Sequence, residues 1–556
     1  MTTALQSNSP GSVFYHSDAP RAALRVAVLL DCLGVPAYGL QILYDLRSAS
    51  YVADVVLHVV RGGPPVPRRG LIAGIGTKIL SAFDRIYGFV HSPDLIQEIP
   101  AGLPASSIKQ LQSAADFRAE GFDVLLDLRR LCWGRDVLEI PHLGVWWLHG
   151  GRRPEDDKWP AFAREIIGGR PGRFVQLLRR MPGAEVEFVL RALEFSGSPF
   201  PSCLANQIDV FSGCGHLVIQ TLWELHRMGP AFVVQRCKLL DQTGFLPSPT
   251  VLGLVRWIVG YGLGRIRNRL GTRAKAVAWR VAVRRAVRPL LFEGAVVDLS
   301  SFRWLDVPEG HFWADPFLFA HAGKVWLFFE EMPASSDRAH ISCGYLDAEG
   351  QLHDVRAVLR LPTHLSYPLL VRSGDDIYML PESSEAGGVD LYRATEFPDK
   401  WERVSRLLEF PCVDSTVFTH EGSWWMFTSP MAVPGNAPET WVFRASDLTG
   451  PWVYQTSSPL SSSASTARGA GNVFAHAGRL IRPSQDCLQS YGRGLNFNSV
   501  EGLEKDNCTE KWVQSLNRNG ELGFAGIHHY NFASDWEVVD ALLPVQRSLK
   551  KTSLAQ

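Results

Sequence analysis

The stretch Asp315-Pro-Phe-Leu-Phe-Ala-His-Ala-Gly323 and two similar stretches decide the fold of the C-terminal half. Asp414-Ser-Thr-Val-Phe-Thr-His-Glu-Gly422 and Ala470-Gly-Asn-Val-Phe-Ala-His-Ala-Gly478 share its Phe-x-His-x-Gly core, and a weaker copy begins at Tyr367. The starts at 315, 367, 414 and 470 lie 52, 47 and 56 residues apart. Repeats of roughly 50 residues with aromatic strands and turn glycines are typical of four-stranded propeller blades. We therefore predict an all-β five-bladed β-propeller over residues 296–545, with the repeated histidines in hairpins on the outer blade surface.

The N-terminal half alternates strand-like and helix-like runs. Short apolar segments at 25–30, 55–60, 124–126 and 144–149 suit buried strands, and a helical pattern covers 38–46. This alternation predicts a doubly wound α/β domain over residues 21–240, with ligands at the carboxyl ends of its strands. No Gly-x-Gly-x-x-Gly run follows the first strand, so no dinucleotide cofactor is predicted. Residues 1–20 and 546–556 are expected to be flexible tails.

The segment between these halves, residues 241–295, is strongly basic. No acidic residue occurs between Asp241 and Glu293. The ten basic residues are Arg256, Arg265, Arg267, Arg269, Arg273, Lys275, Arg280, Arg284, Arg285 and Arg288. Apolar residues lie between them, which predicts an amphipathic helical linker. It either contacts an anionic membrane surface through residues 251–288 or packs between the two domains.

The composition excludes several classes of protein. The chain has 556 residues, 46% of them hydrophobic and 20% charged, which fits folded domains rather than disorder. Its 56 basic residues equal its 56 acidic ones, which argues against a protein that coats nucleic acid. The polar N-terminus and the lack of a long apolar run predict a cytoplasmic protein, peripheral at the inner face of the membrane. Nine scattered cysteines without a Cys-x-x-Cys pair predict neither a disulfide framework nor a metal site.

Polar residues recur where the inner strands of a propeller would converge on its axis. Carboxylates and aromatic walls around one funnel are what glycosyl chemistry needs, since one group moves a proton and another stabilises an oxocarbenium-like centre. Asp315, Asp414 and Glu382 are the predicted catalytic residues. The predicted substrate-binding residues are His311, Trp313, His364, Tyr367, Arg468, Arg482, Asp486 and His529. Trp313 and Tyr367, together with Tyr530, would offer flat faces for sugar rings.

The Ala314-Asp-Pro316 element resembles the start of the first blade in glycoside hydrolase family 43. That resemblance implies that Asp315 is a general base and that Asp414 tunes the acid. The family's acid is a glutamate before Gly-Pro in the fourth blade, where this chain has Arg468-Gly-Ala-Gly471. The departure argues against simple hydrolysis and leaves Glu382 as the candidate acid.

Over residues 300–545 the chain is more similar to the N-terminal propeller of plant glucosamine inositolphosphorylceramide transferases, a domain that bacterial proteins also carry. The similarity lies in Phe312-Trp-Ala-Asp-Pro316, Leu365-Ser-Tyr-Pro368, Pro381-Glu-Ser383, Leu391-Tyr-Arg393 and Arg482-Pro-Ser-Gln-Asp-Cys487. In the plant enzymes a separate domain is credited with transfer, so the resemblance implies the fold more than the activity.

The N-terminal half resembles formyltransferase-like domains through 144–151 and 160–169. His149 matches their catalytic histidine, but Trp147 replaces the asparagine that would hold the oxyanion, which implies a scaffold or ligand-binding role.

We therefore expect glycosyl transfer in the propeller funnel, in the biosynthesis of a surface glycan or glycolipid. The donor would be a sugar nucleotide or a lipid-linked sugar, and no other cofactor is identified. The alternatives are formyl or acyl transfer to an amino sugar by the N-terminal domain, a furanosidase-like glycoside hydrolase, and a non-catalytic glycan-binding protein.

Overall fold

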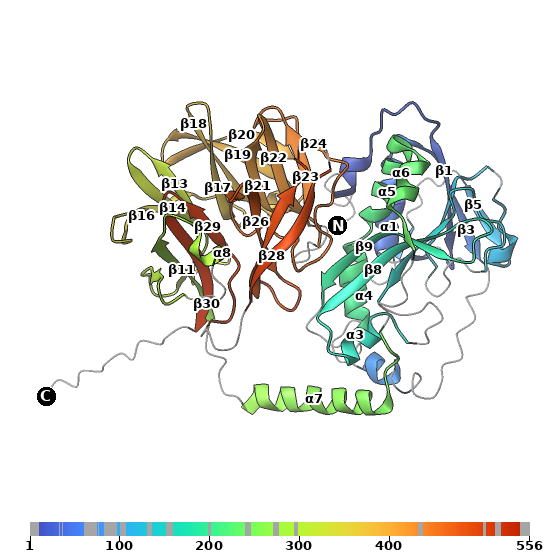
Figure 1. The fold of residues 1–556 in the computed structure, drawn as a ribbon. Coiled ribbons are helices and arrows are strands. Elements are labelled where there is room, and N and C mark those ends of the chain that lie inside the picture. The colour runs from blue at the N-terminus through green and yellow to red at the C-terminus, as the bar shows by residue number, and fades with distance from the viewer. Residues whose placement is uncertain are drawn as a thin grey trace. The chain divides into compact units, whose positions relative to one another are not determined.

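A computed structural model gives the fold (Figure 1). It describes residues 10–544 with internal gaps, and the chain divides into two compact units. The gaps are 33, 36, 61–74, 76, 83–96, 100–106, 120, 130–135, 152–158, 198–201, 240–245, 271–276, 294–298, 432–437, 504–506 and 518–523. The predicted tail 546–556 lies outside the described residues. No helix among those described is long and apolar enough to cross a bilayer.

The first unit is built on an eight-stranded mixed sheet in the order β10-β9-β8-β7-β6-β1-β3-β5. Its parallel part is β1 (Leu24–Leu30), β3 (Val52–Val60), β5 (Ser107–Leu111), β6 (Val124–Asp127) and β7 (Val145–Gly150). The antiparallel part adds β8 (Gly172–Arg180), β9 (Glu187–Ser196) and β10 (Lys238–Leu239). The chain runs outward from β1 through β3 to β5 and then returns to β6 beside β1. This reversal is a topological switch point, where α/β sheets place their ligands.

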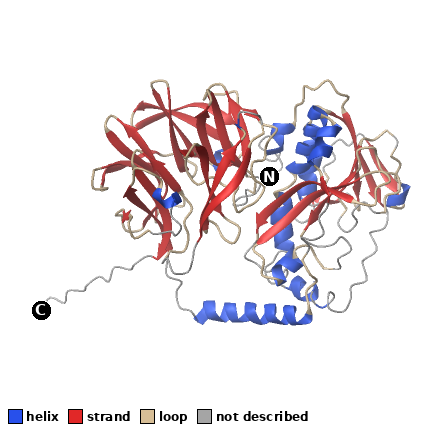
Figure 2. Cartoon of the chain, in the orientation of Figure 1, coloured by secondary structure: helices blue, strands red, loops and turns tan. Residues whose placement is uncertain are grey.

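Helices accompany this sheet (Figure 2). They are α1 (Ala37–Ser48), α3 (Ala163–Ile167), α4 (Cys203–Ser212), α5 (His216–Met228) and α6 (Pro230–Arg236). The predicted flexible tail 1–20 is wrong from Pro10 onward, because Pro10–Phe14 forms a 3-10 helix. Phe14 is fully buried with its ring centroid 5.6 Å from that of Trp223, so burial of this aromatic ring holds the segment in place.

The second unit contains five four-stranded antiparallel sheets, drawn in red in Figure 2, and is a five-bladed β-propeller. The first blade is β13 (His311–His321), β14 (Lys324–Pro333), β15 (His340–Leu346) and β16 (Leu352–Leu359). The second is β17 (Ser366–Ser373), β18 (Asp376–Glu382), β19 (Val389–Glu396) and β20 (Lys400–Leu408). The third is β21 (Cys412–His420), β22 (Ser423–Pro430), β23 (Trp441–Ala445) and β24 (Val453–Tyr454). The fourth is β25 (Phe474–His476), β26 (Arg479–Asp486), β27 (Gly494–Glu501) and β28 (Thr509–Asn517).

The fifth blade joins the two ends of the propeller sequence. It consists of β12 (Arg303–Trp304), β11 (Val277–Arg285), β30 (Trp536–Pro544) and β29 (Tyr530–Ala533). β11 pairs with β30 from Val277 opposite Pro544 to Arg285 opposite Trp536. The prediction of a helical linker over 241–295 is therefore wrong for residues 277–285, and the propeller begins there rather than at 296. Helix α7 (Val251–Leu270) covers the earlier part of that segment.

The repeated Phe-x-His-x-Gly core forms the first hairpin of three blades. His321, His420 and His476 end β13, β21 and β25, and the next strand begins three residues later. Both residues of each two-residue turn have positive φ, as in Ala322 (49°) and Gly323 (74°). This is the type I′ geometry that suits the twist of a tight hairpin.

Candidate functional site

Three inner strands place a residue with left-handed backbone at the same point of their blades. Asp315, Tyr367 and Asp414 have φ of 48°, 47° and 52°. The strand register shifts between Ala314 and Phe317 and between Ser366 and Leu369, so the first two stand at β-bulges. Bulges of this kind turn a side chain out of the regular alternation of a strand. The site lies around these positions.

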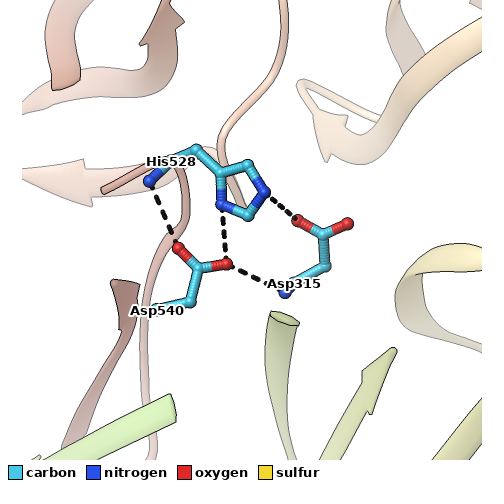
Figure 3. Close-up of side chains that lie close together, drawn as sticks. All are labelled: Asp315, His528 and Asp540. Atoms are coloured by element: carbon cyan, nitrogen blue, oxygen red, sulfur yellow. Dashed lines mark hydrogen bonds and ion pairs between the residues drawn. The ribbon is translucent and has the colours of Figure 1, made fainter. Parts of the chain in front are cut away.

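Asp315, His528 and Asp540 form one buried cluster (Figure 3). The backbone N–H of Asp315 donates to Asp540 Oδ2 at 3.0 Å, and the backbone N–H of His528 donates to Asp540 Oδ1 at 3.2 Å. His528 Nδ1 lies 2.7 Å from Asp540 Oδ2, and its Nε2 lies 3.9 Å from Asp315 Oδ1. The ring of His528 stacks on Trp279 of β11 with centroids 3.8 Å apart. The imidazole is thus clamped between two carboxylates and an indole.

The charges of this cluster fix its protonation. Burial alone would raise the pKa of Asp315, but His529, His528 and Arg468 together lower it to about 2. Burial would likewise lower the pKa of His528, but Asp540 and Asp315 raise it to about 9. Asp315 is therefore an ionised carboxylate beside a protonated imidazole at neutral pH. Its second neighbour, His529 Nδ1, lies 3.5 Å away.

The same cluster has the ligand types of a metal site, since one ligand atom from each residue lies within 4.8 Å of the others. Both ring nitrogens of His528 already face carboxylate oxygens, so a protonated imidazole satisfies the cluster as it stands. A cation would bind only after His528 lost a proton.

A second carboxyl group of the axis, Glu382, stands at the end of β18. Its Oε2 accepts the backbone N–H of Asp414 at 3.3 Å and lies 3.9 Å from an Nη of Arg468. Arg468 itself donates through Nε to Asp414 Oδ2 at 2.6 Å, and Gln485 Nε2 donates to the same oxygen at 3.3 Å. Burial and the charge of Asp414 raise the pKa of Glu382 well above its ordinary value, with Arg468 opposing. One arginine therefore neutralises Asp414, and Glu382 is favoured as the protonated acid.

The predicted ligands His311 and His364 are paired with two consecutive glutamates at the end of β14. His364 Nε2 lies 3.1 Å from Glu330, whose pKa is raised by burial against the opposing effect of His364. His311 Nδ1 lies 2.8 Å from Glu331. Burial would raise the pKa of Glu331, but His340, Ser342 and His311 together lower it to about 2.

The aromatic faces predicted for sugar stacking are not exposed. Trp313, Tyr367 and Tyr530 are all buried, so stacking of sugar rings on their faces stays a prediction that this structure does not support. The Tyr367 hydroxyl accepts the N–H of Gly471 at 2.9 Å and lies 2.8 Å from Thr416 Oγ1, which ties the second, third and fourth blades together. Hydrogen bonding across the blades, rather than ligand contact, accounts for this tyrosine.

Arg482 and Asp486 are also placed differently from their prediction. Arg482 is buried and donates to Glu510 at 3.0 Å and to the carbonyl of Ala467 at 2.6 Å, so its charge is used inside the fourth blade. Asp486 caps a loop by accepting the N–H of Leu488 at 3.1 Å. Of the predicted set, Asp315 and His529 share one group of contacts, and Asp414, Glu382 and Arg468 share another.

Sequence reasoning missed Asp540, Glu330 and Tyr491, and chose His529 as the binding residue rather than its neighbour His528. The aspartate in the apolar run of β30 was the available signal, because an unpaired charge is rarely buried. Tyr491 is 51% exposed, and the guanidinium of Arg468 lies 5.0 Å from its ring centroid. Unlike the three buried aromatic residues described above, Tyr491 therefore presents an exposed ring beside the axis.

His149 lies in the first unit, one residue before the end of β7 and buried there. Trp147 stands two residues earlier, hence on the same face of the strand.

Comparison with known proteins places the similarity in the propeller. Residues 280–531 match the family model described as glucosamine inositolphosphorylceramide transferase 1, N-terminal. The rice (japonica) protein named glucosamine inositolphosphorylceramide transferase 1 is 34% identical over 206 residues, which are 36% of this chain and 28% of the rice protein. The Arabidopsis thaliana protein of that name is 31% identical over 247 residues, 43% of this chain and 32% of the relative. The chain thus spans about a third of these plant proteins.

Among solved structures, a thermostable family-43 glycoside hydrolase is 12% identical with a TM-score of 0.32, and the match covers 43% of this chain and 91% of the hydrolase. An exo-β-1,3-galactanase from Clostridium thermocellum has the same identity and TM-score, with 40% and 56% covered.

Proposed function

We propose that the propeller axis is a glycosyl-handling active site and that the chain transfers a sugar to a glycolipid or surface glycan. The observation that carries this proposal is a pair of buried carboxyl groups, Asp315 and Glu382, whose pKa values are displaced in opposite directions around one axis. When the pKa values of two carboxyl groups differ in this way, one group stays ionised and stabilises positive charge while the other donates a proton. Glycosyl chemistry requires both roles. The similarity of residues 280–531 to glucosamine inositolphosphorylceramide transferases supports the same substrate class.

The residue roles follow from the contacts. Asp315, held by His528 and Asp540, stays negative and stabilises the positive charge that develops at the anomeric carbon. The bond from that carbon to the leaving-group oxygen breaks as the bond to the acceptor oxygen forms. Glu382 gives its proton to the leaving oxygen, and the acceptor hydroxyl releases a proton that restores the acid. Arg468 and Asp414 position Glu382 rather than touch the sugar.

Transfer is favoured over hydrolysis by Arg468. It stands where the resemblance to family 43 would require the acid glutamate, and it is held in an ion pair with Asp414. An activated donor, such as a sugar nucleotide or a lipid-linked sugar, needs less protonation of its leaving group than a glycoside does. The cytoplasmic location predicted from the sequence remains part of this proposal.

The test is turnover of sugar nucleotides and lipid-linked sugars by the purified full chain, with glycolipid acceptors and mass spectrometry of the products. Asp315→Asn and Glu382→Gln should each lower turnover by about 10²-fold or more. Asp376→Asn, an exposed carboxylate at the other end of β18, is the matched control and should leave turnover unchanged. Full activity in both axis variants would end the proposal.

Formyl or acyl transfer by the first unit is the second candidate. The observation in its favour is the position of His149 near the carboxyl end of β7, in a sheet whose strand order reverses between β1 and β6. His149→Ala would abolish a formylated or acylated amino-sugar product under this alternative, and would leave glycosyl transfer at the propeller axis unaffected.

A further inference from the structure

Helix α7 carries a continuous stripe of exposed apolar side chains. Six large apolar residues of this helix are 39–66% exposed, whereas Leu254 is buried on another side of it. They are Val251, Leu252, Val255, Ile258, Val259 and Leu263. At 100° per residue these positions fall within an arc of about 140°, so they form one face of the helix. The helix begins firmly at Thr250, whose Oγ1 accepts the N–H of Gly253 at 3.0 Å.

The charge around this face has one sign. Arg256 borders the stripe, Arg265, Arg267 and Arg269 follow on the same helix, and no acidic residue occurs between Asp241 and Glu293. Two arginines later in the basic segment have acidic partners. Arg284 is bound to Glu537 and Arg288 lies 3.2 Å from Glu293, so those charges are neutralised within the propeller unit. On the helix, Arg256 makes no ion pair with any residue that the structure describes.

We infer that α7 is a membrane-surface helix that binds anionic lipid, with its apolar stripe among the acyl chains and its arginines at the headgroups. A helix of this kind combines an apolar face with flanking cations, and the two contributions add. The partner is a lipid surface rather than a protein. An apolar stripe bordered by arginines is complementary to a surface that is anionic outside and apolar inside. Lipid binding by α7 determines where the chain works and does not depend on whether the propeller axis is catalytic.

The experiment is co-sedimentation of the full chain with vesicles of phosphatidylcholine, with and without phosphatidylglycerol, at low and high salt. We expect binding to the anionic vesicles that weakens as salt rises, since salt screens the arginine contribution. Arg256→Gln should reduce the partition coefficient about fivefold. The triple variant Leu252→Ser, Val259→Ser and Leu263→Ser should reduce it by about a hundredfold.

The matched control replaces two exposed valines of the propeller, Val355→Ser and Val404→Ser, each 40% exposed in the native chain. This variant should bind vesicles like the wild type. Equal binding by the triple variant and the control would overturn the inference. A second outcome would also overturn it: light scattering shows that the wild type is a dimer and the triple variant a monomer, and the wild type does not bind vesicles. The stripe would then be an interface between two copies.

Discussion

Replacing Arg284 by methionine should destabilise the propeller, because this residue holds β11 in the blade that closes it. Arg284 lies directly opposite Glu537 across β11 and β30, and its Nε donates to Glu537 Oε2 at 2.9 Å. Glu537 is 0% exposed, and its other oxygen accepts the Tyr530 hydroxyl at 2.8 Å. The guanidinium also lies 4.3 Å from the ring centroid of Phe302. Methionine keeps the length of the side chain and removes the charge.

The magnitude follows from the carboxylate that is left behind. A buried charge stripped of its partner costs about 3–5 kcal/mol. For a unit of this size that corresponds to a fall in melting temperature of about 10 °C. In Arg284→Met with Glu537→Gln no charge is buried, and the glutamine still accepts from Tyr530, so most of the loss should be recovered. The coupling energy between the two substitutions should be about 2–3 kcal/mol.

The assay is thermal unfolding followed by intrinsic tryptophan fluorescence, with the four proteins of the double-mutant cycle. Arg393→Met is the matched control, because Arg393 also faces a glutamate, Glu402, across two adjacent strands, but at an exposed position. It should shift the melting temperature little, as exposed pairs do. If Arg284→Met shifted it no more than Arg393→Met, the placement of β11 in the fifth blade would be refuted.

Three further predictions concern the axis. The rate of transfer should fall as pH rises through the raised pKa of Glu382, because the acid then loses its proton. The rate should not fall on the acidic side down to about pH 3, because the pKa of Asp315 is about 2. A pH–rate profile checks this, and the profile of Glu382→Gln should lack the alkaline fall. Gly471→Ala should lower the free energy of unfolding by about 3 kcal/mol or more, since its Cβ would stand 1.9 Å from the carbonyl oxygen of Tyr530. Urea unfolding measures this loss, and the control is Gly478→Ala, at a turn position where the added Cβ meets no atom within 4 Å. Tyr367→Phe should cost about 1–3 kcal/mol by the same measurement, because it leaves a buried N–H without its acceptor, and a cost near zero would contradict the hydrogen bonding described for it.

The propeller could be predicted from the sequence because its signal is local and repeated. A hairpin such as Ala322-Gly323 needs two residues of positive φ, and glycine at a fixed distance from an aromatic strand reports that need. Strand β11 carries no such signal. Arg284 of β11 and its partner Glu537 are 253 residues apart in the sequence. The arginines of β11 lie in a segment without acidic residues, a pattern that is typical of a surface helix. Only the closed sheet shows that Arg284 has a buried partner.

Some residues of the candidate site could likewise be predicted from the sequence, and others could not. Asp315 and Asp414 could be found because they occupy equivalent places in two repeats. Nothing local distinguishes His528 from His529. The backbone N–H groups of both donate to Asp540, and only the ring of His528 also contacts its carboxylate. The burial of Trp313 was equally invisible, since an aromatic residue on an inner strand suits a binding wall and a core alike.

The left-handed backbone of the inner strands decides which substitution tests the chemistry cleanly. Left-handed φ costs a non-glycine residue about 1–2 kcal/mol, and asparagine and aspartate tolerate it best. Tyr367 adopts the same φ as Asp315 although its hydrogen bonds are purely structural, so this conformation belongs to the blade and not to catalysis. Alanine at 315 would therefore alter the bulge and the charge together. Asparagine keeps the backbone preference and the N–H to Asp540 while removing the charge, so a loss of turnover in Asp315→Asn reports on the charge and not on the bulge.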